Sequence, residues 1–423
     1  MGEVTRRNDV DDHRWRLDPL VAILPGPRAT LVVSSPHAWG EISASSYQVQ
    51  LLLTFREARS IRQTLAEFPF NKAESHDFLV SCGRLGLLRK ADAEGAVEPP
   101  ERVPAKPRFA GAPSPDPEAP AAFTFLGIPF DGNTTGVPGA RFGPPALRAS
   151  SEGLRYLLDP LTQLPAGFHD FSSGRTLLSG VSLADAGDVY VSPGEDGPEL
   201  YARVTDVVRD LLETGTVPLI AGGDHSLTAP VLRAFPDHPL QILHLDAHTD
   251  LGDVERGDGT GLHHGNVFSV VLDELPHVVE IRQVGLRGII EASSASPRER
   301  VRPMGMDRFR SEGAEAALSG LDTDIATYIS IDVDVVDPSF APSTGTPVPG
   351  GLFPHELKGL LRAAGRQLRV VGVDIMEVAQ PAGPADGTAG VAVEALLHAA
   401  DGVLQRMLSD LSSLPPEGYG ENQ

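Results

Sequence analysis

The stretch ILHLDAHTD (Ile242–Asp250) joins an apolar run to two aspartates and a histidine at alternating positions. A short apolar run of this kind predicts a buried β-strand. Residues two apart in a strand point to the same side, so Asp246, His248 and Asp250 are expected to converge on one spot. Buried carboxylates are unfavourable without compensation. The stretch therefore predicts a site that holds a positive charge at the end of a strand.

Two further segments repeat this arrangement. LIAGGDHS offers Asp224 and His225 directly after an apolar run, and ISIDVDVVDP offers Asp332 and Asp334. Two divalent ions could neutralise the aspartates and histidines of the three segments together. A ligand set dominated by carboxylate oxygen with some imidazole suits Mn²⁺ better than zinc, although iron, cobalt or nickel would also accept it. Two neighbouring ions can lower the pKa of a shared water and so produce hydroxide at neutral pH.

The fold class follows from alternating strand-like and helix-like segments in the C-terminal part of the chain. Helical patterns lie at Glu199–Thr214 and Glu356–Arg366, between apolar strand candidates. The predicted strands are residues 123–130, 216–223, 240–248, 279–288, 326–335 and 368–378. Strands that are apolar almost throughout are typical of parallel sheets covered by helices on both faces. An α/β fold with a parallel sheet is predicted, with ligand sites beyond the carboxyl ends of the strands.

A proline-rich stretch, EPPERVPAKPRFAGAPSPDPEAP, separates this part from a small N-terminal part. Such a composition favours an extended linker. We therefore predict an N-terminal domain over 1–95, a linker over 96–121 and a catalytic domain over 122–415. The N-terminal part combines β-like segments at 20–26 and 29–35 with helical patterns at Ser46–Phe55, Ser60–Phe68 and Glu74–Leu85. Short strands followed by three helices predict a winged-helix-like α+β module.

The net charge limits the classes of partner that the protein can bind, and its cysteine content indicates the cellular compartment. The chain has a net charge of −22, from 35 Lys and Arg against 57 Asp and Glu. This balance argues against nucleic acid or an anionic membrane as the main partner. Residues 1–90 hold 12 Lys and Arg against 10 Asp and Glu, so a protein or peptide partner is favoured for that part. The single cysteine, Cys82, is read as a core thiol; with no signal-like or membrane-spanning apolar run, a cytoplasmic protein is expected.

Several ordered motifs together resemble the arginase/agmatinase (ureohydrolase) family. They are GIPFDGNTTGVPGARFGPPALR, GGDHS, DAHTD, SIDVDVVDPSFAPSTGTPVPGG and DIMEV, spread over residues 123–404. The resemblance implies a three-layer α/β/α fold and a binuclear manganese site. One Mn²⁺ would be held by His225, Asp246, Asp250 and Asp332, and the other by Asp246, His248, Asp332 and Asp334. Asp224 would support His225 without binding metal.

The resemblance also implies a mechanism. A hydroxide oriented by Asp250 would attack a guanidinium carbon, while Glu377 of DIMEV pairs with the guanidinium. His264 in LHHGN would pass a proton to the departing amine, with the adjacent His263 as the alternative. The products would be urea and a primary amine. Glu377 could instead be an ordinary ion-pair partner, and Asp386 is read as structural.

The substrate is less closely defined. Arginases specific for free arginine carry asparagines where this chain has Gly252 and Leu262, so a free amino-acid head group would find few partners. The N-terminal pattern is similar to winged-helix modules that hold leader peptides in ribosomal peptide biosynthesis. Arginine residues within a peptide, converted to ornithine, are therefore favoured over agmatine or another small guanidino compound.

A metal-sensing regulator that uses the N-terminal domain is an alternative of a different class. Retention of every ligand of the resembled family, together with Glu377, argues against it. Members of that family usually form trimers or hexamers, so a homo-oligomer is expected.

Overall fold

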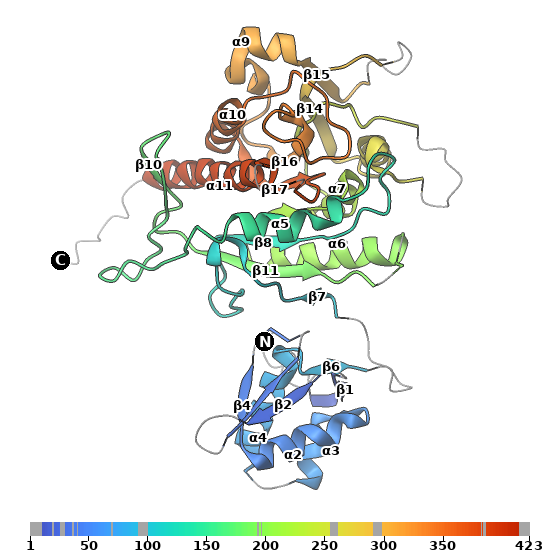
Figure 1. The fold of residues 1–423 in the computed structure, drawn as a ribbon, viewed down its shortest axis with the longest axis vertical. Helices are drawn as coiled ribbons and strands as arrows, with labels where there is room; N and C mark the ends of the chain where they lie inside the picture. The colour runs from blue at the N-terminus through green and yellow to red at the C-terminus, as the bar shows by residue number, and fades with distance from the viewer. Residues whose placement is uncertain are drawn as a thin grey trace, which may run out of the picture. The chain divides into compact units, whose positions relative to one another are not determined.

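The protein forms two compact units, Met1–Pro104 and Ala105–Gln423 (Figure 1). The computed structural model describes residues 11–18, 21–25, 30–35, 38–39, 41–68, 71–91, 100–192, 194–195, 197–253, 261–290, 298–381, 383 and 386–413. Among these residues, no helix is long and apolar enough to cross a membrane.

The described residues of the first unit include two small antiparallel sheets and the helices α2, α3 and α4. One sheet has the order β2-β3-β4 and the other the order β5-β1-β6. The strands are β1 (Arg14–Leu17), β2 (Ala22–Pro25), β3 (Leu31–Ser34), β4 (Ile42–Ala44), β5 (Arg59–Ser60) and β6 (Leu88–Lys90). The helices are α2 (Ser46–Leu53), the 3₁₀ turn η2 (Thr54–Arg56), α3 (Ile61–Glu67) and α4 (Lys72–Arg84). The three helices lie where the sequence pattern predicts them.

The sequence explains where two of these helices begin. Ser45 precedes α2, and its hydroxyl accepts a hydrogen bond from Gln48 N–H while the Gln48 side chain accepts one from Ser45 N–H. Ser60 and Gln63 form the same reciprocal pair at α3. Each pair satisfies two backbone donors that a helix start leaves unpaired. The helices then pack around a core that includes the buried thiol of Cys82.

The second unit is built on a parallel sheet. Within this unit the strand order is β15-β14-β13-β16-β17-β12-β8-β11, and neighbouring strands in this order pair in parallel. The strands are β8 (Phe123–Gly127), β11 (Leu183–Val189), β12 (Val217–Ala221), β13 (Leu240–Leu245), β14 (Val278–Leu286), β15 (Val301–Gly305), β16 (Ala326–Asp332) and β17 (Arg369–Met376). The predicted α/β fold with a parallel sheet is confirmed.

Helices cover both faces of this sheet (Figure 1). One buried core includes residues of α5 (Gly143–Ser150), α9 (Met306–Leu318), α10 (Pro354–Gln367) and α11 (Thr388–Ser413). The other includes residues of α6 (Pro198–Glu213), α7 (Thr228–Leu232) and α8 (Val267–Glu274). The second unit also has a hairpin of β9 (Phe168–Asp170) and β10 (Arg175–Leu177), whereas the short strand β7 (Arg102–Val103) lies among the residues of the first unit. The result is a three-layer arrangement.

Burial on both faces explains why the strands are apolar throughout. In β12, Leu219 and Ala221 pack into the first core, whereas Ile220 between them packs into the second. In β13, Leu243 likewise packs into the first core and its neighbour Ile242 into the second. Fully burying one such side chain contributes about 1.5–3 kcal/mol, which fixes the strand register.

Part of the segment predicted as a linker is packed into the second unit. Residues 105–121 belong to that unit. Phe109 is fully buried and stacks on Phe125 with 4.3 Å between ring centroids. Its backbone N–H donates to Asp185 Oδ2 (2.7 Å), and Asp185 also pairs with the buried Arg148. Contacts made by distant parts of the chain therefore fix a stretch whose composition suggests an extended linker.

Candidate active site

Neighbouring strands carry the predicted site residues to one edge of the sheet. Asp246 directly follows β13, Asp332 ends β16, Glu377 follows β17, and His225 begins the turn η5 (His225–Leu227) after β12. These four strands are consecutive in the sheet, in the order β13-β16-β17-β12. Because carboxyl ends of parallel strands meet at the same edge, the residues come together there.

The side chains converge for a reason different from the predicted strand alternation. His248 and Asp250 lie in the loop after β13, where Asp250 adopts a left-handed backbone with φ of 49°. In this loop, His248 N–H donates a hydrogen bond to Asp246 Oδ1 (2.5 Å). The segment after β16 has the same arrangement, in which Asp334 N–H donates to Asp332 Oδ1 (2.8 Å). Aspartates that accept from the residue two positions on are typical of turns. The turns, rather than the pleat of a strand, direct these side chains toward one another.

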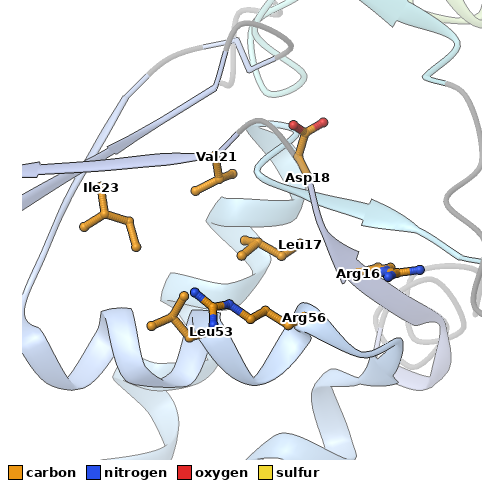
Figure 2. A pocket seen from close by; sticks show the side chains of 7 residues that line it. All are labelled: Arg16, Leu17, Asp18, Val21, Ile23, Leu53 and Arg56. Atoms are coloured by element: carbon orange, nitrogen blue, oxygen red, sulfur yellow. The ribbon is translucent and has the colours of Figure 1, made fainter.

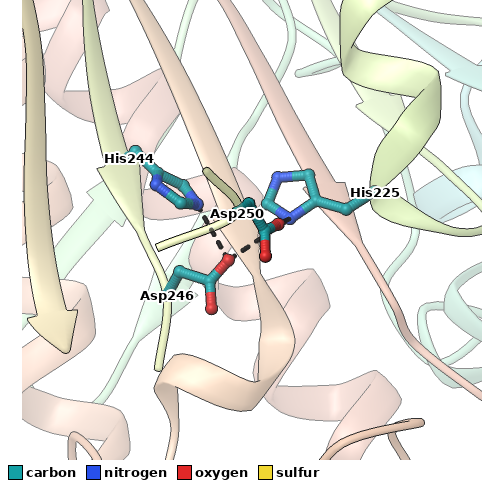
Figure 3. Close-up of side chains that lie close together, drawn as sticks. All are labelled: His225, His244, Asp246 and Asp250. Carbon is teal, nitrogen blue, oxygen red and sulfur yellow. Dashed lines mark hydrogen bonds and ion pairs between the residues drawn. The ribbon is translucent and has the colours of Figure 1, made fainter. Parts of the chain in front are cut away.

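Two groups of side chains meet at Asp246. His225 Nδ1 lies 3.4 Å from Asp246 Oδ2 and 3.1 Å from Asp250 Oδ2 (Figure 3). It also lies 3.5 Å from Asp332 Oδ2. On the other side, His248 Nδ1 lies 3.4 Å from Asp246 Oδ1 and 3.0 Å from Asp334 Oδ2. All six residues predicted as metal ligands are thus brought together, with Asp246 between the groups.

Burial and charge crowding dominate the electrostatics of the cluster. Burial, followed by the charge of Asp246, raises the pKa of Asp250 and raises the pKa of Asp334 to about 6. Burial, followed by the charge of Asp334, raises the pKa of Asp332 well above its ordinary value. Burial opposes the charged form of His248, but hydrogen bonds to Asp246 and Asp334 raise its pKa to about 11. So many carboxylates in one buried place require compensating positive charge.

The His225 side chain shows that the site fits a metal. Its Nε2 lies 2.9 Å from Ser330 Oγ, and Ser330 Oγ donates to Asp374 Oδ1 (2.7 Å). Because the hydroxyl gives its proton to Asp374, it accepts one from His225 Nε2–H. The lone pair of a neutral His225 is then on Nδ1, which is buried and makes no hydrogen bond to the described residues. A lone pair aimed at three carboxylates is what a bound cation requires.

Glu377 and His264 form a second pair beside this cluster. Glu377 Oε1 accepts from His225 N–H (2.9 Å) and lies 3.1 Å from His264 Nδ1. Glu377 Oε2 is buried and has no hydrogen-bond partner among the described residues. His264 Nε2 accepts a hydrogen bond from Thr135 N–H (3.0 Å) and lies 2.7 Å from Thr135 Oγ1. Of the two adjacent histidines, His264 therefore lies against Glu377.

Glu377 favours the charged form of His264. Burial lowers the pKa of His264, but the hydrogen bond and the charge of Glu377 outweigh it and raise this pKa above its ordinary value. Asp224 lies nearby, and burial followed by the charge of Glu377 raises its pKa to about 7. Its carboxylate accepts from Ser226 N–H (3.0 Å) and Asn133 N–H (2.9 Å). Asp224 thus holds the backbone around His225 and ties it to the loop that carries Thr135.

The two positions singled out for substrate recognition lie in closed surroundings. Gly252 N–H donates to Gly265 O (2.9 Å), and a Cβ on Gly252 would lie 2.8 Å from that oxygen. Leu262 is only 2% exposed and belongs to the core on the α6–α8 face of the sheet. Asp386 accepts hydrogen bonds from Thr388 and Ser343, so its carboxylate holds the loop that follows Ala341.

Sequence reasoning missed several residues that hold the site in shape. Ser330 and Asp374 orient His225, and Thr135 contacts His264. His244 lies close enough to His225, Asp246 and Asp250 to form a possible metal-binding group with them (Figure 3). Ser330 lies two residues before Asp332 on β16, and His244 lies two residues before Asp246, which directly follows β13. This spacing is a signal that the sequence does contain.

Comparisons with known proteins identify relatives of this chain. A model of the arginase family matches residues 121–401. A guanidinopropionase from Pseudomonas aeruginosa is 36% identical over 289 residues, which are 65% of this chain and 86% of that protein. A mitochondrial agmatinase from Gallus gallus is 34% identical over 269 residues, 60% of this chain and 73% of that protein.

Solved structures share the fold. Proclavaminate amidinohydrolase from Streptomyces clavuligerus has a TM-score of 0.60 and 32% identity, covering 73% of this chain and 100% of that one. Formiminoglutamase from Trypanosoma cruzi with Mn²⁺ has a TM-score of 0.58 and 25% identity, covering 71% and 100%. The chain belongs to the arginase family of ureohydrolases.

Proposed function

We propose that this ureohydrolase binds two Mn²⁺ ions and hydrolyses the guanidino group of arginine residues within a peptide, leaving ornithine and urea. The observation that carries the substrate preference is the closed environment of Gly252 and Leu262. Free-arginine enzymes are expected to hold the amino-acid head group at these positions. Here one position has no room for a side chain and the other is packed in the core. A substrate without a free amino-acid head group does not need contacts at these two positions.

The donor set supports the two-ion site. His225, Asp246, Asp250 and Asp332 would hold one ion, and Asp246, His248, Asp332 and Asp334 the other. When bound, the ions would activate a water as the nucleophile by lowering its pKa. The carboxylate of Asp250 would accept a hydrogen bond from that water and orient it. The related formiminoglutamase structure with Mn²⁺ supports the choice of metal.

Glu377 and His264 provide the groups that meet the substrate. Oε1 of Glu377 already accepts from His225 N–H, so the buried Oε2 is the atom left to accept from a guanidinium N–H. His264 donates from Nδ1 to Glu377, and its Nε2 accepts from Thr135 N–H. The charged form would carry a second proton on Nε2, directed to Thr135 Oγ1, in place of the bond from Thr135 N–H. A proton from His264 would pass to the departing amine nitrogen as its C–N bond breaks.

The first unit offers a pocket suited to a peptide. The cavity has a volume of about 310 Å³, and Arg56 reaches across it toward Leu53 (Figure 2). Its lining residues are Arg16, Leu17, Asp18, Val21, Ile23, Leu53 and Arg56. An apolar wall beside arginines suits a peptide that alternates apolar and acidic side chains. Such a peptide would be repelled by the acidic chain as a whole but not by residues 1–90, where basic residues slightly outnumber acidic ones.

Variants of the full-length chain test this proposal. Arg56→Glu should raise KM for a long peptide with leucine and glutamate residues before its arginine. The same change should leave KM for a short blocked arginine peptide unaltered. Arg84→Glu, an exposed arginine of α4 outside the pocket, is the matched control. Equal KM values for the long peptide in the Arg56→Glu and Arg84→Glu variants would overturn the role of this pocket.

A small guanidino compound such as agmatine is the second candidate. The 34% identity to an agmatinase favours it. In that case agmatine would be turned over with a higher kcat/KM than any blocked arginine peptide, and the Arg56→Glu change would have no effect on either substrate. A trimer or hexamer is the proposed assembly in both cases, as the family resemblance implies.

A further inference from the structure

We propose that His244, held by Gln283, orients the shared carboxylate of Asp246 and is not itself a metal ligand. This inference rests on the two-ion site proposed above. It concerns a positioning residue on the strand that leads into the DAHTD loop.

Hydrogen-bond geometry fixes the Gln283 amide. His244 on β13 and Gln283 on β14 are partners in the sheet register, and they are 0% and 1% exposed. Gln283 Nε2 lies 2.7 Å from Thr249 O and 3.0 Å from His244 Nδ1. A carbonyl oxygen only accepts, so the group that faces Thr249 must be the NH₂ end of the amide. The second hydrogen of this NH₂ then points at His244 Nδ1.

The amide in turn fixes the proton on His244. Because Nδ1 accepts from Gln283, the neutral ring carries its proton on Nε2. Nε2 lies 2.8 Å from Asp246 Oδ2 and donates to it (Figure 3). Asp246 Oδ1 accepts from His248 N–H, so both carboxylate oxygens are held. His244 thus fixes the orientation of the carboxylate that the two ions would share.

The alternative is that His244 serves as a further ligand. Its ligand atom lies within 4.8 Å of those of His225, Asp246 and Asp250, so distance alone permits this. A ligand nitrogen needs a free lone pair, however, and Nε2 carries the proton. The ring is also packed against Phe268, with 4.2 Å between centroids. Gln283 additionally binds the carbonyl of Thr249, so the same amide holds the loop that carries His248 and Asp250.

Manganese titration of the full-length, metal-free chain tests this assignment, with free Mn²⁺ followed by electron paramagnetic resonance. His244→Phe removes the donor and Gln283→Met removes the amide, whereas His244→Gln keeps an N–H group. Phe and Met variants should still bind two ions per chain, with affinity reduced about 10–100-fold. The His244→Gln variant should recover part of that loss.

Gln241→Met is the matched control. Gln241 lies on the same strand, is 2% exposed and also binds through its amide, to Thr327 Oγ1 and Asp322 O. Its loss should leave manganese affinity unchanged. Binding of fewer ions by His244→Phe, without recovery in His244→Gln, would make His244 a ligand and overturn the inference. Unchanged affinity in the Phe and Met variants would also overturn it. Failure of the unaltered chain to bind two ions would instead overturn the two-ion proposal beneath it.

Discussion

At the scale of single residues, the site depends on two backbone conformations that side chains rarely adopt. Asp250 and Glu377 have φ values of 49° and 62°. A left-handed non-glycine residue costs about 1–3 kcal/mol and persists where its surroundings hold it. Glu377 is held by its N–H, which donates to Gly223 O (2.8 Å), and by the N–H of His225 on its carboxylate. The strain places the free Oε2 of Glu377 in the site.

Glu377→Gln keeps this shape and removes the charge. A charge-assisted hydrogen bond contributes about 1.5–3 kcal/mol, so kcat/KM for urea release should fall about 10–100-fold. Manganese affinity should stay as in the unaltered chain, because Glu377 is not among the proposed ligands. Glu356→Gln, at the start of α10, where the side chain accepts a hydrogen bond from Phe353 N–H, is the control and should keep full activity. A Glu377→Gln variant with normal kcat/KM would refute the proposed guanidinium contact.

Thr135→Val tests the proton-carrying role of His264. The change removes the hydroxyl that would accept from a proton on His264 Nε2, and it keeps the backbone N–H, which donates to the unprotonated Nε2. Catalysis by a protonated His264 is lost as pH rises through its pKa. The pKa should be lower in the variant, so the alkaline fall of kcat should begin at a lower pH. A pH profile of kcat checks this, with Thr134→Val as control. An unshifted alkaline limb would argue against His264 as the acid.

The sequence predicted the candidate ligands, which the structure brings close together, and missed the residues that orient them. Candidate ligands such as Asp246 and His248 stand in recognisable motifs. An orienting residue is a single polar side chain within an apolar strand, and its partner lies far away in sequence. His244 binds Gln283, 39 residues on, and Ser330 binds Asp374, 44 residues on. Such pairs become apparent only once the strands are adjacent.

At the scale of elements, patterns of apolar residues predicted strands and helices well where local packing decides. The pattern predicts a strand over 240–248 and a helix over 199–214; β13 covers Leu240–Leu245 and α6 covers Pro198–Glu213. The exception is the segment 105–121, whose frequent prolines predict an extended linker although the segment is packed. Its anchors, Phe125 and Asp185, are contributed by other strands, so composition alone gives no sign of them.

Phe109→Ala measures how firmly this segment is anchored. Removing a fully buried phenylalanine should lower the free energy of unfolding of the second unit by about 3–5 kcal/mol. Phe171→Ala, at a side chain 92% exposed, should change it by less than about 0.5 kcal/mol. Chemical denaturation followed by circular dichroism gives both values. Equal stabilities for the two variants would mean that residues 105–121 behave as a loose linker.

At the scale of the whole molecule, the two units have separate cores. The sequence predicted the parallel-sheet fold of the second unit, because motif spacing and apolar strands define it. The winged-helix reading of the first unit remains a prediction, since short strands and three helices fit many small folds. The choice of a peptide over a small molecule as the substrate also remains a proposal. It depends on the part of the substrate beyond the guanidino group, whereas the hydrolysis reaction is the same for both.

Removal of manganese should affect the units differently. A ligand present at one hundred times its Kd stabilises a protein by about 2.7 kcal/mol. Removal of manganese by a chelator should therefore lower the unfolding temperature of the second unit. Cys82 reports on the first unit, because burial raises the pKa of its thiol to about 12 and hides it from reagents. Its labelling rate in the native protein should stay the same with and without metal. Faster labelling after chelation would show that the metal site also stabilises the first unit.

The most direct test of the central claim is a competition in one tube. The manganese-loaded chain is given equal concentrations of agmatine and a short arginine peptide blocked at both ends, and the products are followed by mass spectrometry. The account predicts that the peptide's arginine becomes ornithine, with matching urea, before agmatine is consumed. Conversion of agmatine to putrescine while the peptide mass stays unchanged would contradict it.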